Sequence, residues 1–307
     1  MFGRVLVATT ALALSSCSSA AASGGDRDAV TLPADQQAFL DTCEPWDEWD
    51  KPAPPFQIYG NSYYVGTCGI ASILITDDEG HVLLDSGTEA GARVVERNIG
   101  LLGYEVRDVT LLGYSHEHFD HVGGMAYLQE VTGASLVALE AGAQAMRTGE
   151  SDPADPQHAM HEPFAAARVD FVHKDGDAMG VGALLVRSFA TPGHTPGGTS
   201  WQWNSCEGLV CKTIVFADSL SPVSRDDYRF SDHPEYLAEY RAGLDRLAKI
   251  DCDILLAPHP SHAQLLKHIE KGTLLSMDTP CPAYAAKKHS DLDKRLSKEA
   301  AEAPGLQ

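Results

Sequence analysis

The spacing of apolar and polar residues predicts a mixture of short strands and amphipathic helices. Two apolar runs, Ala71–Thr76 and His81–Asp85, flank an Asp/Gly turn, which predicts a β-hairpin. Apolar residues at three- and four-residue steps predict helices over Glu89–Leu102 and Tyr236–Ile250, each with one apolar face. The other short apolar runs predict strands at DVTLLGYS, ASLVALE, ALLVRSFA, GTSWQW, CKTIVFADS and CDILLAP.

The order of these elements predicts the fold class. A hairpin, a helix, a strand, a helix and a strand follow one another in the first half, and the second half repeats this mixture. This order predicts an α/β fold of the αββα sandwich type, in which two mixed β-sheets pack together and are flanked by helices. We expect a single domain over residues 37–307, preceded over 18–36 by a flexible lead-in of small and polar residues.

Residues 1–17 have the pattern of a signal peptide. Arg4 precedes an apolar run, Val5–Leu14, which is too short to span a bilayer and is followed by small residues. We therefore expect export to the periplasm. The stretch Leu14–Cys17 is similar to a bacterial lipobox, in which the cysteine carries a lipid that anchors the protein to the membrane. Cleavage of an ordinary signal peptide further on, within SSAAAS, is the alternative, and both hypotheses stay open.

The cysteine count agrees with export. Of seven cysteines, six remain after Cys17 is set aside: Cys43, Cys68, Cys206, Cys211, Cys252 and Cys281. Six cysteines can form three disulfides in an oxidising compartment, although composition alone leaves their pairing open. Buried free thiols are the alternative. No cysteine lies within a histidine cluster, so a thiolate metal ligand is not expected.

The charge balance narrows the classes of partner. The chain of 307 residues has a formal net charge of −20 and no long run of Lys or Arg. We therefore do not expect the protein to bind nucleic acid through a basic patch. The acidic balance suggests solubility and does not identify a substrate.

The stretch SHEHFDHVGG, Ser115–Gly124, is the strongest candidate for chemistry. It contains His116, His118, Asp120 and His121 directly after a predicted strand. Imidazole and carboxylate groups are ligands that zinc accepts, and a loop at the end of a strand can hold them rigidly. A solvated polar loop is the alternative. One short stretch cannot complete two zinc sites, so further ligands must come from elsewhere.

Two other histidines occur in similar contexts. His194 lies in ATPGHTPGG, and His259 lies in LLAPHPSH with His262 close behind; each follows a predicted apolar strand. Functional groups often lie on loops held by a rigid scaffold. The polar, proline-containing segment Glu150–Glu162 is expected to be a surface loop that could border the site. The remaining histidines are interpreted as turn or surface residues: His81, His158, His161, His173, His233, His268 and His289. For His158 and His161 a place at the site stays open, because they lie in the loop that could border it.

SHEHFDHVGG, TPGHTPGG and LLAPHP, in this order within about Tyr59–Cys281, resemble the metallo-β-lactamase superfamily. The His-x-His-x-Asp-His motif is specific to that superfamily but not to one reaction, because its members include thioesterases, lactonases, sulfatases and phosphodiesterases. The segments FADSLSPVS and CDILLAPHP are similar, more finely, to the third subclass of zinc β-lactamases. The resemblance implies the same αββα fold that the element order predicts.

The resemblance also implies two zinc ions (Zn²⁺) per chain and a set of site residues. The ligands of the first zinc would be His116, His118 and His194. The ligands of the second zinc would be Asp120, His121 and His259. Ser219 and Ser221 would bind the carboxylate of the substrate. The implied disulfides are Cys43–Cys68, Cys206–Cys211 and Cys252–Cys281.

Two further carboxylates are assigned supporting roles. In glyoxalase-type hydrolases an Asp at the position of Asp218 bridges both metals, whereas in the β-lactamases it is not a ligand. We expect Asp218 to lie behind the ligands, as in the β-lactamases. Asp85, which ends VLLDSG, is expected to support the ligand loop through hydrogen bonds.

The function that the resemblance implies is hydrolysis of the β-lactam amide bond of penicillins, cephalosporins and carbapenems, giving antibiotic resistance. Hydroxide formed from zinc-bound water would attack the carbonyl carbon, and Asp120 would orient it. The partner is a small-molecule β-lactam, and the family default is a monomer. A lactone or thioester hydrolase of the same fold is one alternative. A non-catalytic zinc-binding lipoprotein is another, although a purely structural zinc site usually closes with four protein ligands.

Overall fold

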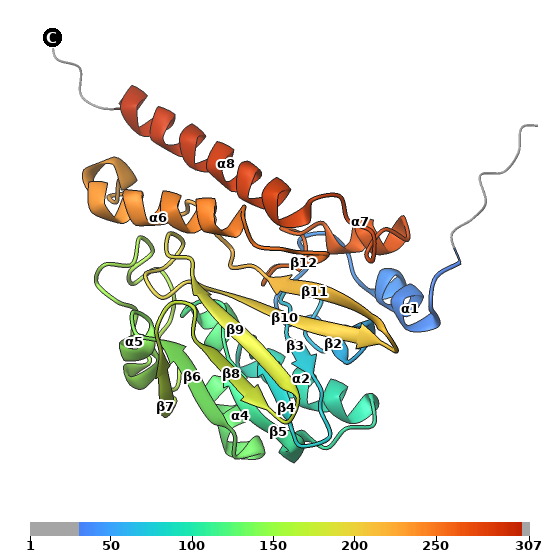
Figure 1. The fold of residues 1–307 in the computed structure, drawn as a ribbon. Helices are drawn as coiled ribbons and strands as arrows, with labels where there is room; N and C mark the ends of the chain where they lie inside the picture. Colours follow the sequence, from blue (N-terminus) through green and yellow to red (C-terminus); the bar gives the residue numbers. More distant parts are fainter. Residues whose placement is uncertain (1–30, 303–307) are drawn as a thin grey trace, which may run out of the picture. The chain divides into compact units, whose positions relative to one another are not determined.

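Two β-sheets pack face to face, and helices cover their outer faces, in the computed structural model, which describes residues 31–302 (Figure 1). This arrangement confirms the predicted αββα sandwich of two mixed β-sheets. The described residues from Leu32 onward form one compact unit. The predicted signal peptide at 1–17, including Cys17, and the lead-in as far as residue 30 lie outside the described residues.

The first sheet contains seven strands that lie side by side in chain order. They are β1 (Phe56–Tyr59), β2 (Ser62–Tyr64), β3 (Ile73–Ile75), β4 (His81–Leu84), β5 (Val109–Gly113), β6 (Ser135–Leu139) and β7 (Val169–His173). Neighbours are antiparallel from β1 to β4 and parallel from β4 to β7. Because parallel strands run in the same direction, the loops that follow β4 and β5 leave the sheet at the same edge.

The second sheet contains five strands in the order β12, β11, β10, β9, β8. Their bounds are β8 (Ala178–Val181), β9 (Leu184–Ala190), β10 (Thr199–Glu207), β11 (Val210–Phe216) and β12 (Ile254–Leu256). The strands β8 to β11 form an antiparallel meander, and β12 pairs with β11 in parallel.

Helices connect the strands and cover both sheets. They are α1 (Ala34–Thr42), α2 (Glu89–Leu101), α3 (Phe119–Val122), α4 (Met125–Thr132), α5 (Ala143–Thr148), α6 (Pro234–Leu247), α7 (Leu265–Glu270) and α8 (Pro280–Glu302), with 3-10 turns η1 (Val106–Asp108) and η2 (Phe230–Asp232). The helix α2 begins after Thr88, whose hydroxyl accepts a hydrogen bond from the N–H of Gly91 over 3.0 Å. Within residues 31–302, we find no helix with the length and apolar character needed to cross a membrane.

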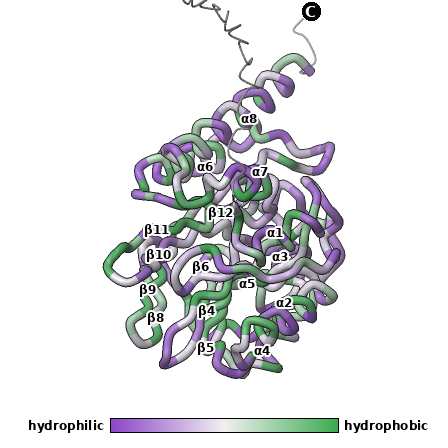
Figure 2. Tube along the Cα trace, turned by 90° about the vertical axis from the view of Figure 1, so that its right-hand side faces the viewer, coloured by the Kyte–Doolittle hydropathy of each residue, from purple (hydrophilic) through white to green (hydrophobic). Residues whose placement is uncertain are grey.

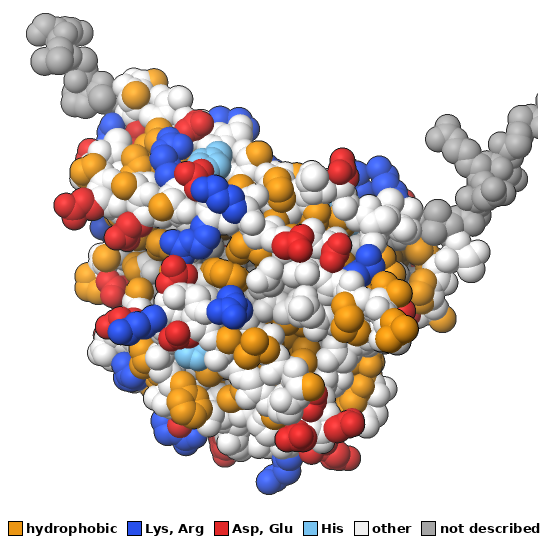
Figure 3. Space-filling model, in the orientation of Figure 1, with side chains coloured by type: hydrophobic (Ala, Val, Ile, Leu, Met, Phe, Trp, Pro, Cys, Tyr) orange, Lys and Arg blue, Asp and Glu red, His pale blue; other side chains and the backbone are white. Residues whose placement is uncertain are grey.

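The apolar runs at β3, β4 and β12 correspond to strands that are buried on both faces. In β3, Ile73 and Ile75 belong to the core between the sheets, whereas Leu74 faces the core under α2 and α4. Successive side chains of a strand point to opposite faces, so a strand that lies between two cores must be apolar throughout. Figure 2 shows apolar colouring along strands of both sheets. On the face drawn in Figure 3, Lys and Arg side chains are interspersed among Asp and Glu.

The structure corrects one predicted boundary and adds elements that the pattern did not indicate. The lead-in was expected to extend to Gln36, but α1 begins at Ala34, so that residues 34–36 are helical. Phe39 of this helix is buried in the core against Phe56, which explains why the segment is ordered. The strand β7 was not predicted because its residues are largely exposed and lack a regular apolar alternation.

Three disulfides join the six cysteines in the pairs that the resemblance implied. They are Cys43–Cys68, Cys206–Cys211 and Cys252–Cys281. Cys206 and Cys211 lie opposite each other across the β10–β11 hairpin. The Cys252–Cys281 bond ties the segment before β12 to the first turn of α8, so that helix is fixed to the second sheet at its start.

Candidate metal centre

The loop after β5 carries four of the predicted ligands. They are His116, His118, Asp120 and His121, and the last two lie on the short helix α3. Asp85, directly after the neighbouring strand β4, holds this loop. Its carboxylate accepts hydrogen bonds from the N–H of Ser115 over 2.5 Å and from the Ser115 hydroxyl over 2.7 Å. Adjacent parallel strands thus bring a buried anchoring carboxylate and the ligand loop together.

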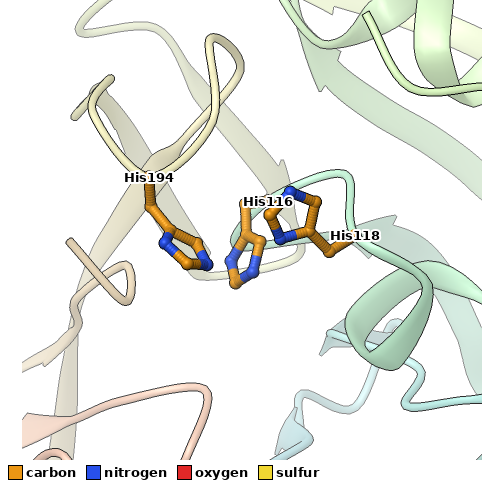
Figure 4. A group of neighbouring side chains, drawn as sticks. All are labelled: His116, His118 and His194. Atoms are coloured by element: carbon orange, nitrogen blue, oxygen red, sulfur yellow. The ribbon is translucent and has the colours of Figure 1, made fainter. Parts of the chain in front are cut away.

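Loops of the second sheet bring the remaining histidines to the same place. His194 lies between β9 and β10, and its ring points toward those of His116 and His118 (Figure 4). One potential ligand atom from each of these three residues lies within 4.8 Å of the others. The three side chains are almost fully buried. Two segments nearly 80 residues apart in the chain therefore supply one group of three imidazoles.

A second group adjoins the first. Potential ligand atoms of His116, Asp120 and His121 also lie within 4.8 Å of one another. His259 follows β12, and its Nε2 lies 3.3 Å from Oδ2 of Asp120. The rings of His259 and His121 are perpendicular, with centroids 4.9 Å apart. All six predicted ligands thus lie close together. His116 belongs to both groups of converging ligand atoms, whereas His259 belongs to neither and adjoins the second group through Asp120 and His121.

Each histidine of the first loop has one ring nitrogen next to a buried carboxylate. Nδ1 of His116 lies 2.8 Å from Asp218. Nε2 of His118 lies 2.9 Å from Asp155. Nδ1 of His121 lies 3.2 Å from Asp85.

The other two histidines use carbonyl groups in the same way. Nδ1 of His194 lies 2.9 Å from the Ser221 carbonyl oxygen, and Nδ1 of His259 lies 3.3 Å from that of Gly69. Metal-binding histidines typically donate their second ring nitrogen to such acceptors, which sets the tautomer. Nε2 of His116 is buried and has no hydrogen-bond partner among the described residues. A buried polar atom without a partner, in a set of imidazole and carboxylate donors, fits zinc.

Burial and neighbouring charges set the protonation of these groups. Burial and the adjacent histidines hold the pKa of His116 well below its usual range, and burial does the same for the pKa of His194. Both imidazoles are therefore neutral at neutral pH, the form that binds metal. Burial raises the pKa of Asp120, but His121 and His259 outweigh it and hold that pKa well below its usual range. Burial lowers the pKa of His121, but the neighbouring carboxylates of Asp120 and Asp85 outweigh this effect and raise that pKa to about 10. The surroundings of His121 thus favour positive charge.

Asp218 lies behind the ligands. It is fully buried, burial raises its pKa well above the usual range, and its Oδ1 is next to Nδ1 of His116. Among the described residues it belongs to neither group of converging ligand atoms. A buried carboxylate in this position, next to a ring nitrogen of His116, can orient that ring.

The two serines predicted to bind substrate differ in exposure. Ser219 is fully buried, and its hydroxyl has no hydrogen-bond partner among the described residues. Ser221 is partly exposed, and its hydroxyl oxygen accepts a hydrogen bond from Nζ of Lys288 over 2.9 Å. Since the Ser221 carbonyl also contacts His194, this residue borders the ligand groups directly.

Sequence reasoning missed Asp155 and Gln157. They lie in the loop predicted as a surface segment, yet Asp155 is fully buried against His118, and Nε2 of Gln157 lies 3.4 Å from Nε2 of His194. His161, interpreted from sequence as a turn or surface residue, has its ring centroid 4.9 Å from that of His118. Residues 149–151 and 157–164 of this loop line a cavity of about 430 Å³ with residues 117–119. A polar, proline-containing segment carries no local signal for such contacts.

Comparisons with known proteins agree with this geometry. Residues 65–259 match the family model of the metallo-β-lactamase superfamily. The MIM-2 metallo-β-lactamase is 50% identical and covers 88% of this chain and 100% of its own, with a TM-score of 0.85. MIM-1 from Novosphingobium pentaromativorans is 43% identical and covers 87% of this chain and 100% of its own, also with a TM-score of 0.85. MEM-A1, a subclass B3 metallo-β-lactamase from a soil metagenome library, is 35% identical over 83% of this chain and 100% of its own, with a TM-score of 0.78.

A second set of relatives matches a smaller part of the chain. The hydroxyacylglutathione hydrolase of Bradyrhizobium sp. (strain ORS 278) is 26% identical over 161 residues, which is 50% of this chain and 54% of that protein. The chain thus spans about half the length of the hydroxyacylglutathione hydrolases that it matches. The resemblance to the β-lactamases is both closer and more extensive.

Proposed function

The chain belongs to the metallo-β-lactamase superfamily and is a zinc hydrolase, and from this premise we propose that it hydrolyses the β-lactam amide bond of penicillins, cephalosporins and carbapenems. The observation that carries the proposal is the match to named metallo-β-lactamases over their whole length at 35–50% identity. This activity would give antibiotic resistance.

The proposal includes two zinc ions per chain. His116, His118 and His194 would hold one, and Asp120, His121 and His259 would hold the other. Bound zinc supplies a water molecule of lowered pKa and polarises the carbonyl group of the substrate. The protein supplies the fixed orientation of each ring through the carboxylate or carbonyl group behind it.

Asp120 is the side chain to which we assign a catalytic role. Its contacts with His121 and His259 both use Oδ2, so Oδ1 is left to accept a hydrogen bond from the attacking water. The low pKa of Asp120 keeps it ionised over the neutral range, as an acceptor requires. The Ser221 hydroxyl, at the border of the ligand groups, would bind the substrate carboxylate. Ser219 is buried, so its side chain would need to rotate toward the substrate before its hydroxyl could also bind the substrate carboxylate.

A thioester or lactone hydrolase is the second candidate, because hydroxyacylglutathione hydrolases match half of the chain. The position of Asp218 behind His116 weighs against it. In that class of enzyme the corresponding Asp is expected to bridge the metals, whereas here its Oδ1 lies 2.8 Å from Nδ1 of His116 and the residue belongs to neither group of converging ligand atoms.

We further propose that the protein acts in the periplasm as a monomer. The signal-peptide pattern at residues 1–17 and the three disulfides support export to an oxidising compartment. A lipid anchor at Cys17 depends on the lipobox-like stretch alone, and mass spectrometry of the mature N-terminus would decide it.

The first experiment measures hydrolysis of a carbapenem and of nitrocefin by the purified mature chain with zinc added. We expect rapid turnover that a chelator abolishes and added zinc restores, with about two zinc ions bound per chain. Asp120→Ala, which removes a ligand and the proposed acceptor, is the inactive control.

The same preparation is then given S-lactoylglutathione and an acyl-homoserine lactone. Turnover of either of these, in a zinc-loaded protein that leaves both β-lactams intact, would reject the proposed substrate class and favour the second candidate.

A further inference from the structure

Lys288 of α8 is a buried cation without an ionic partner. The residue is only 2% exposed, and within residues 31–302 no carboxylate oxygen lies within 4.0 Å of its Nζ. Its hydrogen bond goes to the hydroxyl oxygen of Ser221 over 2.9 Å, and Nζ lies 5.0 Å from the centre of the Tyr284 ring. The neighbouring Lys287 instead has a carboxylate partner, Asp291, at 2.5 Å.

Burial of an unpaired ammonium group opposes folding. Removing a charge from water is costly even after the surrounding protein relaxes, and an apolar side chain of similar size is often as stable or more stable in such a place. Burial lowers the pKa of Lys288 to about 7, which reflects the same cost, so the ammonium form is fully populated only below neutral pH and substrate selection should be measured there. A cost of this kind is typical of a functional group.

One residue, Ser221, connects the ammonium group of Lys288 to the candidate metal centre. Ser221 accepts from Lys288 through its hydroxyl oxygen, and its carbonyl oxygen contacts Nδ1 of His194. Ser221 is partly exposed, whereas Lys288 is not. The hydroxyl proton of Ser221 is directed at the carbonyl oxygen of Ser219 over 3.3 Å, a long contact that a stronger acceptor would replace.

We propose that Lys288 is a positioning residue for anionic substrates: it supplies, through the Ser221 hydroxyl, the positive charge that selects the carboxylate of the substrate. This inference rests on the proposed function. The carboxylate would accept the proton of Ser221, whose oxygen is polarised by the ammonium group behind it. The lining of the cavity beside His118 includes Glu117, Glu150 and Glu162 and no Lys or Arg, so it offers no positive charge of its own to an anionic substrate.

The test compares one cephalosporin as the free acid with its methyl ester, using the zinc-loaded full chain. Lys288→Met removes the charge and keeps a long unbranched side chain. For the acid, KM is expected to rise about tenfold, the effect of losing one hydrogen bond to a charged group, while kcat changes little. For the ester, neither KM nor kcat is expected to change. Lys287→Met, on the same helix with a side chain that is 59% exposed, is the matched control and should change neither substrate.

The outcomes separate the two levels of the argument. An equal effect of Lys288→Met on acid and ester, or no effect on either, overturns the inference, because a purely structural role would not distinguish them. If the wild type hydrolyses neither compound, the proposed function is wrong, and the inference, which rests on it, is wrong as well. If Lys288→Met fails to bind zinc or does not give the circular-dichroism spectrum of the folded protein, the inference is tested with Ser221→Ala and Lys288→Arg instead. Ser221→Ala must lose the preference for the acid and Lys288→Arg must keep it.

Discussion

At the scale of single residues, the carboxylates behind the histidines organise the site. Asp155 is the one that no motif indicated, and its carboxylate has two contacts. Oδ2 lies 2.9 Å from Nε2 of His118, and Oδ1 accepts the N–H of Gln157 over 2.7 Å. It therefore orients a ligand and also holds the loop that approaches His194.

Asp155→Asn is expected to weaken zinc binding by about 10- to 100-fold, because the charged acceptor that sets the tautomer and basicity of His118 is lost. Zinc affinity is measured by competition with a chromophoric chelator, which does not depend on activity. Asp226→Asn, at an exposed position that also loses one negative charge, is the control. Identical zinc affinities for the two variants would show that Asp155 does not act on His118.

At the scale of elements, the C-terminal helix α8 supports the site from behind the second sheet. It brings Lys288 to Ser221, and the hydroxyl of Tyr284 donates to the carbonyl oxygens of Asp218 and Ser219. Near its end, Glu299 is buried and accepts hydrogen bonds from the N–H groups of Phe230 and Ser231, one with each carboxylate oxygen. The helix thus fixes η2 as well as the segment after β11.

Glu299→Gln is expected to lower the free energy of unfolding by about 1–3 kcal/mol near neutral pH, because the amide has one acceptor oxygen for two backbone donors and loses the charge that pairs with Nε of Arg295 over 2.7 Å. Burial raises the pKa of Glu299, but the hydrogen bonds outweigh it and hold that pKa below 4.5. The contribution is therefore present above about pH 4.5 and is lost as the pH falls through the folded-state pKa. Urea unfolding across this pH range is the measurement.

Glu302→Gln, at an exposed position of the same helix, should match the wild type at every pH. A difference between wild type and Glu299→Gln that persists unchanged to low pH would mean that the carboxylate charge is not the source of the stability.

At the scale of the whole molecule, the disulfides differ in the length of chain that they close. Cys206–Cys211 spans 5 residues within one hairpin, whereas Cys252–Cys281 spans 29 and joins α8 to the second sheet. A longer closed loop restricts the unfolded chain more strongly.

Replacing both Cys252 and Cys281 by Ser is expected to lower the free energy of unfolding by about 3–4 kcal/mol, and replacing Cys206 and Cys211 by about 2 kcal/mol, on the chain-entropy estimate. Urea unfolding of the zinc-loaded variants measures both values. An equal loss, or a larger loss for the hairpin bond, would contradict an origin in loop length.

Much of the fold was predictable because its signals are local. The apolar runs at β3, β4 and β12 are continuous where a strand is buried on both faces, and the three- and four-residue steps of α2 follow one helix face. The strands β1, β2, β7 and β8 and the short helix α1 were missed. These elements form through contacts with residues that are distant in the chain, such as the packing of Phe39 against Phe56.

The sequence by itself determined the types of ligand and their place after strands, because a His-x-His-x-Asp-His motif and an apolar run are contained within a few residues. Only the tertiary structure decided which groups support them. Asp155 is 37 residues from His118, and Lys288 is 67 residues from Ser221. Such contacts form when the sandwich closes and water is excluded, since a hydrogen bond between distant segments leaves no periodic trace in either one.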